Sequence, residues 1–259
     1  MFSGSHGSGA VFFSGCNLSC LFCQNYEISA YQKGSLCQPE RLAEIFLQLQ
    51  AQDAHNINLV TPTPHLLAIR TALKLAKAQG LHLPVLYNTN AYERVESLQS
   101  LEGLVDIYLP DLKYVSPAFS KRLSGAEDYF DFAAPAIQEM QRQVGLLQLD
   151  NNGIAVRGLL IRHLVLPGCL EETRFVLNHI SQALPQGTWL SLMRQYTPAG
   201  NIAQLPSMLK RTLTEREYQR AVQYCLDLGM EHVLLQEKEA ANCAFTPAFE
   251  NDLPALWQK

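Results

Sequence analysis

Apolar residues follow two different periods along this chain, and the two periods alternate. Short apolar runs rich in β-branched or aromatic residues predict strands at 10–13, 57–61, 84–90, 105–113, 158–168 and 188–198, with a further candidate at 231–237. Apolar residues at helical spacing predict helices between these runs, at about 39–49, 66–80, 95–103, 175–183 and 214–229. The alternation predicts βαβ units and a mainly parallel sheet.

Residues that favour helix ends support these boundaries. Pro39 is suited to the first position of a helix, and Gly80 and Gly103 are suited to the residue that follows one. The sequence from Thr214 to Glu217 has the pattern of a capping box. The pattern therefore predicts where several helices begin and end.

The predicted sheet indicates where a ligand should bind. Several strands are apolar on both faces, which is typical of a sheet covered on both sides. No linker-like segment separates two domains, so we expect one α/β domain, built as a full or partial barrel or as an open doubly wound sheet. In such folds ligands bind at the carboxyl ends of the strands. Polar residues follow five of the predicted strands, at 14–16, 61–65, 88–90, 111–113 and 194–197.

Composition narrows the classes of function. The chain has 259 residues, is 47% hydrophobic and carries a net charge of −4, so no basic excess supports a nucleic-acid partner. No apolar run reaches the roughly 18 residues of a membrane span, and the N-terminus has no secretory pattern. We therefore expect a cytoplasmic protein without a membrane partner. Seven cysteines without an export signal favour metal or redox use over a disulfide framework.

Three of these cysteines lie within eight residues, directly after the first predicted strand. Cys16, Cys20 and Cys23 have the spacing C-x3-C-x2-C. Iron–sulfur clusters usually take four thiolates and structural zinc takes four ligands, so three thiolates indicate a metal centre with one open position. Two alternatives stay open: three buried structural thiols, or a zinc site with a fourth ligand or a water.

The spacing and its surroundings resemble the radical S-adenosylmethionine (SAM) superfamily, in which an aromatic residue precedes the last cysteine, as Phe22 does here. The stretch FFSGCNLSCLFCQN is similar to the activating enzymes of pyruvate formate-lyase and their uncharacterised relatives. YLPDLK at 108–113 and LLIRHLVLPG at 159–168 resemble their fourth and fifth strands. The resemblance implies an α/β fold of the partial (β/α)6 barrel type with mainly parallel strands. It implies one radical SAM domain, with a core at about 8–237 and a C-terminal extension at 238–259.

The resemblance also implies cofactors and a reaction. Cys16, Cys20 and Cys23 would hold a [4Fe–4S] cluster whose fourth iron binds the amino and carboxylate groups of SAM. Reductive cleavage of SAM would give a 5′-deoxyadenosyl radical that abstracts hydrogen from a substrate. Such a cluster needs a low-potential electron donor of the flavodoxin or ferredoxin type. Because the chain starts almost at the first strand, we expect a short family form or a truncated reading frame.

Charged residues near the ends of two strands are candidates for contact with SAM. Asp111 and Lys113 are two residues apart, so they share one face of an extended chain with Ile107 and Leu109. The resemblance implies that Lys113 binds the SAM carboxylate and that Asp111 pairs with Lys113 or with the SAM amino group. A rim salt bridge is the alternative. Arg162 matches an inward position near SAM or a substrate carbonyl, which leaves His163 facing outward as a core residue.

Further candidates come from the third, first and sixth strands. Asn88 and Asn90 share a face, and Asn90 is a candidate for hydrogen bonding to SAM, although asparagine also suits turns. By the same resemblance, Phe22 would pack beside the adenine, and Gln195 would lie near the adenosine.

One segment departs from the activating enzymes. Where they carry Gly-Gly-Glu-Pro after the second strand, this chain has TPTPH at 61–65, without a carboxylate. Backbone carbonyls or the hydroxyls of Thr61 and Thr63 would then accept from the SAM amino group. His65 either takes part in this segment's function or begins the next helix without a catalytic role.

Three functions stay open at this stage. The first is a radical SAM enzyme acting on a protein or peptide, with a glycine of a partner enzyme as one target, and the second is such an enzyme acting on a small molecule. The third is a non-enzymatic iron–sulfur or zinc protein, which needs a fourth ligand, Cys37 being the nearest choice. We expect Cys169 and Cys225 to be structural thiols.

Overall fold

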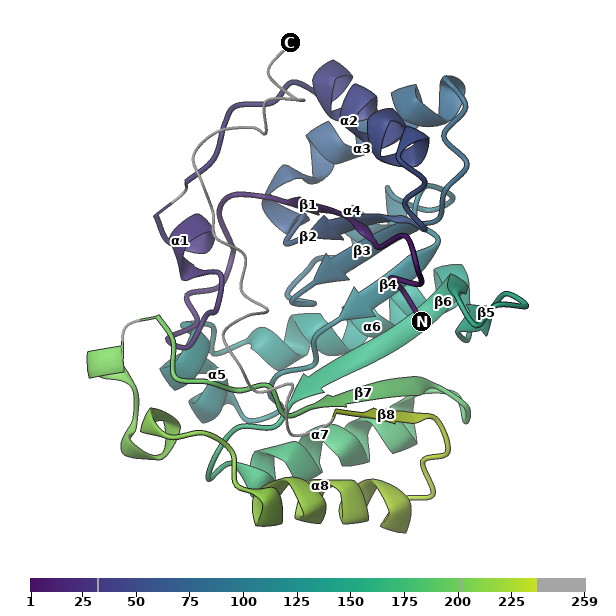
Figure 1. Ribbon diagram of the computed structural model, residues 1–259. Coiled ribbons are helices and arrows are strands. Elements are labelled where there is room, and N and C mark those ends of the chain that lie inside the picture. Colours follow the sequence, from purple (N-terminus) through teal and green to yellow (C-terminus); the bar gives the residue numbers. More distant parts are fainter. Residues whose placement is uncertain (32, 201, 237–259) are drawn as a thin grey trace.

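The strands of the computed structural model, which describes residues 1–31, 33–200 and 202–236, form one curved sheet of eight strands (Figure 1). Seven strands pair in parallel in the order β1, β2, β3, β4, β6, β7, β8, and β5 pairs antiparallel to β6. Their bounds are β1 (Gly9–Phe12), β2 (Ile57–Val60), β3 (Val85–Thr89), β4 (Ile107–Pro110), β5 (Gln148–Leu149), β6 (Ala155–Leu164), β7 (Trp189–Met193) and β8 (Val233–Leu235). Because each strand neighbours the next along the path, the sheet is a partial barrel, as expected.

Helices connect the parallel strands and cover the outer face of the sheet (Figure 1). The longer ones are α2 (Pro39–Ala51), α3 (Leu66–Ala78), α6 (Tyr129–Val144), α7 (Leu170–Ala183) and α8 (Glu215–Asp227). The shorter ones are α1 (Tyr26–Ser29), α4 (Val95–Gln99), α5 (Pro117–Ser124), η1 (Thr63–His65), η2 (Ile202–Gln204) and η3 (Ser207–Lys210). No described helix has both the length and the apolarity of a membrane span.

The helix ends confirm several boundary predictions. Pro39 is the first residue of α2, and Thr214 caps α8 through a capping box with Glu217. Gly80 follows the C-cap of α3 with a positive φ angle. The helix expected to reach Gly103 is shorter than predicted, because α4 ends at Gln99. The extension expected at 238–259 lies outside the described residues.

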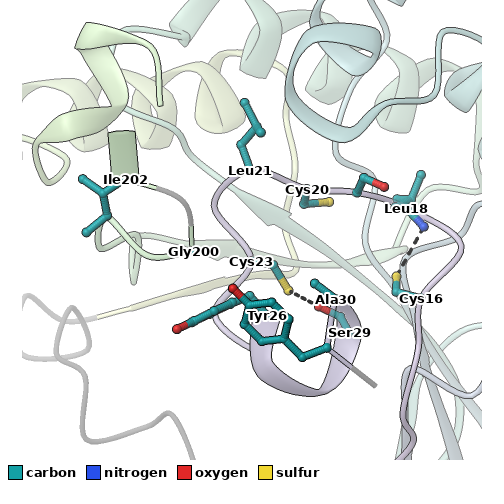
Figure 2. Close-up of a pocket in the computed structure, with 12 residues that line it drawn as sticks. Cys16, Leu18, Cys20, Leu21, Cys23, Tyr26, Ser29, Ala30, Gly200 and Ile202 are labelled. Carbon is teal, nitrogen blue, oxygen red and sulfur yellow. Dashed lines mark hydrogen bonds between the residues drawn. The ribbon is translucent and has the colours of Figure 1, made fainter. Parts of the chain in front are cut away.

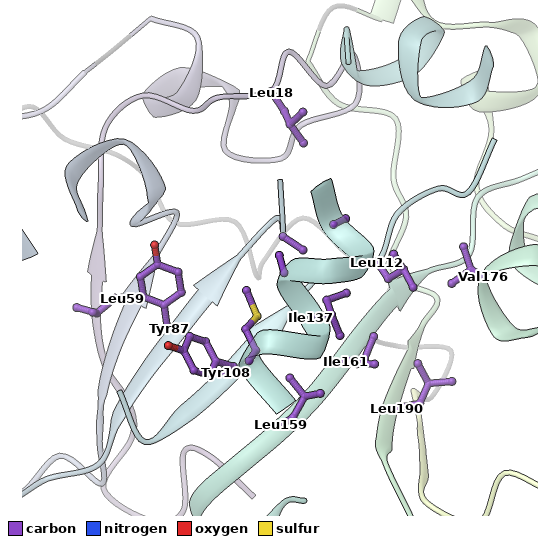
Figure 3. Packing of buried hydrophobic residues seen from close by; sticks show 14 of the residues in the cluster. Leu18, Leu59, Tyr87, Tyr108, Leu112, Ile137, Leu159, Ile161, Val176 and Leu190 are labelled. Carbon is purple, nitrogen blue, oxygen red and sulfur yellow. The ribbon is translucent and has the colours of Figure 1, made fainter. Parts of the chain in front are cut away.

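The two faces of the sheet have separate apolar clusters. The face toward the helices carries residues such as Leu59, Tyr87 and Leu159, which belong to the main core (Figure 3). The face toward the lumen of the partial barrel carries a smaller cluster that includes Leu86, Leu109 and Leu160. Strands of this sheet are thus buried on both faces, in line with their nearly continuous apolar runs.

The amino ends of the strands are covered by the N-terminal segment. Met1 and Phe2 pack against the lumen cluster. The amide of Asn56 donates to the carbonyl of Phe2 at 2.6 Å, and the amide of Ala155 donates to the carbonyl of Met1 at 2.9 Å. The segment covers this end of the lumen, so chemistry is expected at the carboxyl ends of the strands.

Candidate functional site

The three clustered cysteines line one cavity at the carboxyl end of β1. Gly15, with φ of +84°, turns the chain out of the strand. In the loop that follows, Cys16, Cys20 and Cys23 border a cavity of about 780 Å³ (Figure 2). A Cβ on Gly200 would lie 2.6 Å from the carbonyl oxygen of Leu21, so the segment after β7 approaches this loop as closely as a glycine permits. The fold therefore brings all three cysteines to the border of one cavity.

Each of these sulfur atoms has a polar neighbour. Cys16 Sγ accepts from Asn90 Nδ2 and from the backbone amide of Leu18, each at 3.4 Å. Cys20 Sγ lies 3.0 Å from the hydroxyl of Ser124, and Cys23 Sγ lies 3.4 Å from the hydroxyl of Ser29. These groups would continue to donate to thiolates, which accept hydrogen bonds only.

Burial disfavours the charged form of two of the thiols. It raises the pKa of Cys16, and it raises the pKa of Cys20 to about 11. The positive charge of Lys113 acts in the opposite direction on both pKa values. A bound metal centre supplies the missing positive charge and deprotonates a coordinating thiol. The site is therefore suited to metal-bound thiolates.

A network of partly buried charges lies at the ends of β4 and β6. Lys113 Nζ is 2.7 Å from Asp111 Oδ2, and Arg162 Nη2 is 2.6 Å from Asp111 Oδ1. Burial alone would raise the pKa of Asp111, but the two cations hold it below its usual value. Burial alone would lower the pKa of Lys113, but Asp111 outweighs this and the net shift is upward. Asp111 and Lys113 are therefore both charged at neutral pH.

Arg162 faces the lumen, which is the orientation that the resemblance implied. Arg162 and Asn88 border a lumen cavity of about 590 Å³ together with Ser191 and Asn58. His163 points the other way, into the helix layer, where its Nδ1 lies 2.8 Å from the carbonyl of Leu112. Burial lowers the pKa of His163 to about 4, so its ring is neutral at neutral pH.

Asn90 lies in a different environment from Asn88. Its Nδ2 donates to Asn17 Oδ1 at 2.8 Å as well as to Cys16, and its Oδ1 accepts from the amide of Tyr92 at 2.9 Å. The side chain therefore joins the end of β3 to the cysteine loop. Its contact with SAM stays a prediction.

The segment after β2 is held from the helix side by a carboxylate that the sequence analysis did not identify. Thr63 Oγ1 donates to Glu93 at 3.0 Å, and Thr89 Oγ1 donates to the same carboxylate at 2.5 Å. Glu93 is 4% exposed, and its burial raises its pKa despite these donors. Thr61, at the end of β2, has φ of +58°, which is rare for a β-branched residue. Such an outlier at the mouth of the barrel marks a candidate functional segment.

The model of the radical SAM superfamily matches residues 10–144, which include the cysteine loop, Asp111 and Lys113. The chain belongs to the radical SAM superfamily. A relative from Methanocaldococcus jannaschii, itself an uncharacterized protein, is 33% identical over 235 residues; the match covers 85% of this chain and 64% of the relative. This chain thus spans less than two thirds of that protein's length.

Several solved structures have a similar fold. Streptococcus suis SuiB bound to its precursor peptide SuiA gives a TM-score of 0.61 at 11% identity, over 89% of this chain and 49% of SuiB. SuiB bound to S-adenosylmethionine gives a TM-score of 0.60 at 11% identity, over 94% of this chain and 54% of SuiB. A domain of a pyruvate-formate lyase-activating enzyme from Bacteroides vulgatus gives 0.50 at 15% identity, over 71% of this chain and all of that domain. At these identities the similarity concerns the fold.

The donor set fits the cofactors of the radical SAM superfamily, a [4Fe–4S] cluster and SAM. Three cysteines border one cavity, each with a polar neighbour, and the charge of the partly buried Lys113 acts on Cys16 and Cys20. Within the described residues, no three His, Cys, Asp or Glu side chains are arranged to hold a single metal ion. A four-iron cluster differs from zinc because each thiolate binds its own iron.

Two other candidates lie close to the cysteine loop. Phe22 is 8% exposed and meets the ring of Tyr196 edge-on at 5.9 Å. The backbone carbonyl of Gln195 accepts from Gln24 Nε2 at 3.3 Å, and its side-chain oxygen accepts from Gln236 at 3.0 Å. Both residues thus help to pack the loop, and their contacts with SAM stay predictions.

The remaining cysteines and His65 have structural surroundings. Cys169 and Cys225 are buried in the main core, as expected. Cys37 Sγ donates to the carbonyl of Gln38 at 3.7 Å, and Cys37 does not border the described cavity that the three clustered cysteines line. His65 ends η1, and its Nε2 lies 2.6 Å from the carbonyl of Ser14, which ties this segment to the chain before Cys16.

Proposed function

We propose that this chain is a radical SAM enzyme of the activating-enzyme-like type, acting on a protein or peptide. The observation that supports it is the position of Cys16, Cys20 and Cys23 around one cavity, near the partly buried ion pair of Lys113 and Asp111. When bound, the [4Fe–4S] cluster and SAM supply reductive cleavage of the C5′–S bond and a 5′-deoxyadenosyl radical. The electron would come from a donor of the flavodoxin or ferredoxin type.

The roles of the chain's own residues follow from their positions. The three thiolates would hold the cluster, and Lys113 would pair with the SAM carboxylate. Arg162 and Asn88, on the lumen wall, would orient SAM or a substrate carbonyl, with Phe22, Asn90 and Gln195 around the adenosine. Thr61 and Thr63 would border the site of the SAM amino group. They belong to the segment after β2, which Glu93 holds in place by accepting from Thr63. We assign residues of about 8–237 to this single domain.

A macromolecular substrate is supported by the rim of the site and by the comparisons. Tyr26, Tyr31 and Ile202 border the cysteine cavity, and Tyr31 and Ile202 are exposed. Figure 2 shows the ring of Tyr26 beside Cys23. SuiB binds a precursor peptide, and a second structural neighbour is an activating enzyme. We propose a peptide segment of a partner protein as the target, with a glycine as the residue that loses hydrogen.

The first experiment tests the enzyme class. The protein is reconstituted anaerobically with iron and sulfide and then incubated with SAM and dithionite. We expect four irons per chain and release of 5′-deoxyadenosine, both abolished in Cys20→Ala and retained in the control Cys225→Ala. Full cluster content in Cys20→Ala, or a loss in Cys37→Ala without any spectral effect of SAM on the wild type, would contradict the proposal.

The second experiment tests the substrate. Lysate from cells grown in deuterated medium is separated by size, and each fraction is added to the enzyme with unlabelled SAM. Deuterium in 5′-deoxyadenosine from the macromolecular fraction supports a protein or peptide substrate, especially if protease treatment removes the activity. Deuterium transfer from the small-molecule fraction alone would instead support an enzyme of small molecules.

A further inference from the structure

The environments of the three cysteines differ in one respect. Asn90 and Ser29, beside Cys16 and Cys23, are partly exposed, and their distances to sulfur are 3.4 Å. Ser124, beside Cys20, is 1% exposed and lies at 3.0 Å. Its hydroxyl is also 3.0 Å from the hydroxyl of Tyr114, which is likewise 1% exposed. Cys20, Ser124 and Tyr114 thus form a buried chain of polar groups.

The direction of the hydrogen bonds in this chain follows from its chemistry. A metal-bound thiolate has no proton, so Ser124 must donate to Cys20. A hydroxyl has a single proton, so Ser124 can then only accept from Tyr114. The relay therefore runs from Tyr114 through Ser124 to Cys20, and each donor polarises the next.

The fold holds this relay in a fixed position. Ser124 is the last residue of α5, and Gly125 after it has φ of +75°. The amide of Ser19 donates to the carbonyl of Ser124 at 3.0 Å, and the amide of Leu21 donates to the carbonyl of Leu123 at 2.9 Å. The cysteine loop is therefore bonded on both sides of Cys20 to the end of α5.

We propose that the Tyr114–Ser124 relay sets the reduction potential of the cluster by donating to the Cys20 thiolate. The inference rests on the proposed function. The couple is the one-electron reduction of the [4Fe–4S] cluster from its 2+ to its 1+ state by an external low-potential donor, without proton transfer through the relay. The reduced cluster carries more negative charge, so a donor to its thiolate stabilises the reduced form and raises the potential. Burial strengthens this effect because the local dielectric constant is low.

The test is a redox titration of the reconstituted protein followed by electron paramagnetic resonance. At the midpoint potential of the wild type, Ser124→Ala should contain about tenfold less reduced than oxidised cluster. This ratio corresponds to a reduction potential about 59 mV more negative for a one-electron couple. Tyr114→Phe leaves Ser124 in place and should shift the potential in the same direction by less. Ser124→Thr, which keeps a hydroxyl, should stay near the wild type.

Matched controls separate the relay from general packing. Ser120→Ala removes another buried serine of α5, whose hydroxyl donates to the carbonyl of Pro117 at 3.0 Å. Tyr108→Phe removes a buried tyrosine hydroxyl that donates to Gln143 at 2.8 Å. Neither should shift the potential.

Unchanged potentials in Ser124→Ala and Tyr114→Phe, each with four irons, would overturn the proposal. If Ser124→Ala fails to take up iron, the reduction potential of Tyr114→Phe decides whether the proposal holds. If the wild type cleaves SAM but both relay variants have the wild-type reduction potential, this inference is overturned and the proposed function stands. A wild type that holds no [4Fe–4S] cluster overturns the proposed function and this inference with it.

Discussion

Buried polar groups lie on both faces of the sheet, and their hydrogen bonding differs. On the helix side, both ring nitrogens of His163 have partners, the carbonyl of Leu112 and the hydroxyl of Thr173. The Glu93 carboxylate accepts from Thr63, Thr89 and Tyr87. These groups resemble ordinary buried polar groups, which nearly always have partners.

On the lumen side, some buried polar atoms have no hydrogen-bond partner. Among the described residues, the buried atoms Asn58 Oδ1 and Arg162 Nε lack a hydrogen-bond partner, and both side chains border the lumen cavity. Two further such atoms belong to Gln141 and Arg174 on helices. Arg162 pairs with Asp111 through Nη2, which leaves its Nε able to donate to a ligand. The contrast indicates that the helix-side groups stabilise the structure, whereas the lumen groups can still form hydrogen bonds with a ligand.

The strongest test of the lumen side is Asp111→Asn. The change leaves Lys113 and Arg162 as two partly buried cations without their common partner, with side chains that are 20% and 23% exposed. Removing one member of a buried pair costs about 3–5 kcal/mol of unfolding free energy, as measured by denaturant titration. The control is Glu127→Gln, which breaks an exposed pair with Lys121 and should cost at most about 1 kcal/mol. Equal costs for the two variants would show that the lumen charges do not depend on one another.

The helix side makes a prediction about pH through His163. Its pKa is lowered from 6.5 to about 4, so folding favours the neutral ring. The resulting stability is complete above pH 6.5 and is lost as the pH falls from 6.5 toward 4, by about 3 kcal/mol in total. We expect His163→Gln to flatten the denaturation free energy over this range, whereas His82→Gln, at an exposed site, should not. A wild-type slope that persists in His163→Gln would assign the acid sensitivity to other groups.

Ligand binding separates the two faces directly. A ligand present at 100 times its dissociation constant stabilises the folded state by about 2.7 kcal/mol. We expect SAM to do this for the reconstituted wild type and for the helix-side variant Thr173→Val, but to lose most of the effect in Lys113→Met. Thermal unfolding with and without SAM measures it. Equal stabilisation of Lys113→Met and the wild type would remove Lys113 from the SAM site.

The features of the fold and of the site that could be predicted from the sequence are those carried by residues close together in the chain. Cys16, Cys20 and Cys23 lie within one loop, and Asp111 and Lys113 lie two residues apart, so their spacing predicted that each set lies together. The seven parallel strands and the helices α2, α3, α4, α7 and α8 followed from periodicity in the same way. The orientation of Arg162 and His163 to opposite faces followed from the alternation of a strand.

Other parts depended on contacts between distant segments. No prediction covered α6, in which Pro135 interrupts an otherwise regular pattern. Tyr129 of this helix places its hydroxyl 2.9 Å from the carbonyl of Asn90 and 2.7 Å from that of Asp111, joining the ends of two strands. Ser124 is 104 residues from Cys20, and Glu93 is 30 residues from Thr63. No local spacing connects such pairs, so only the fold could reveal them.

The smallest expected effect concerns Glu93, whose burial raises its pKa above the usual value. Folding therefore favours the protonated carboxyl, and its contribution to stability is complete below about pH 4.5 and is lost as the pH rises through the raised pKa. Glu93→Gln imitates the neutral form and keeps an oxygen that accepts from Thr63 or Thr89. We expect its unfolding free energy relative to the wild type to increase between pH 4.5 and pH 7, whereas the exposed Glu231→Gln should show no such trend. Because glutamine keeps an acceptor for Thr63, the segment after β2 stays held and the affinity for SAM should change little. Parallel stability curves combined with a large loss of SAM affinity would move Glu93 from the structural to the ligand-binding group.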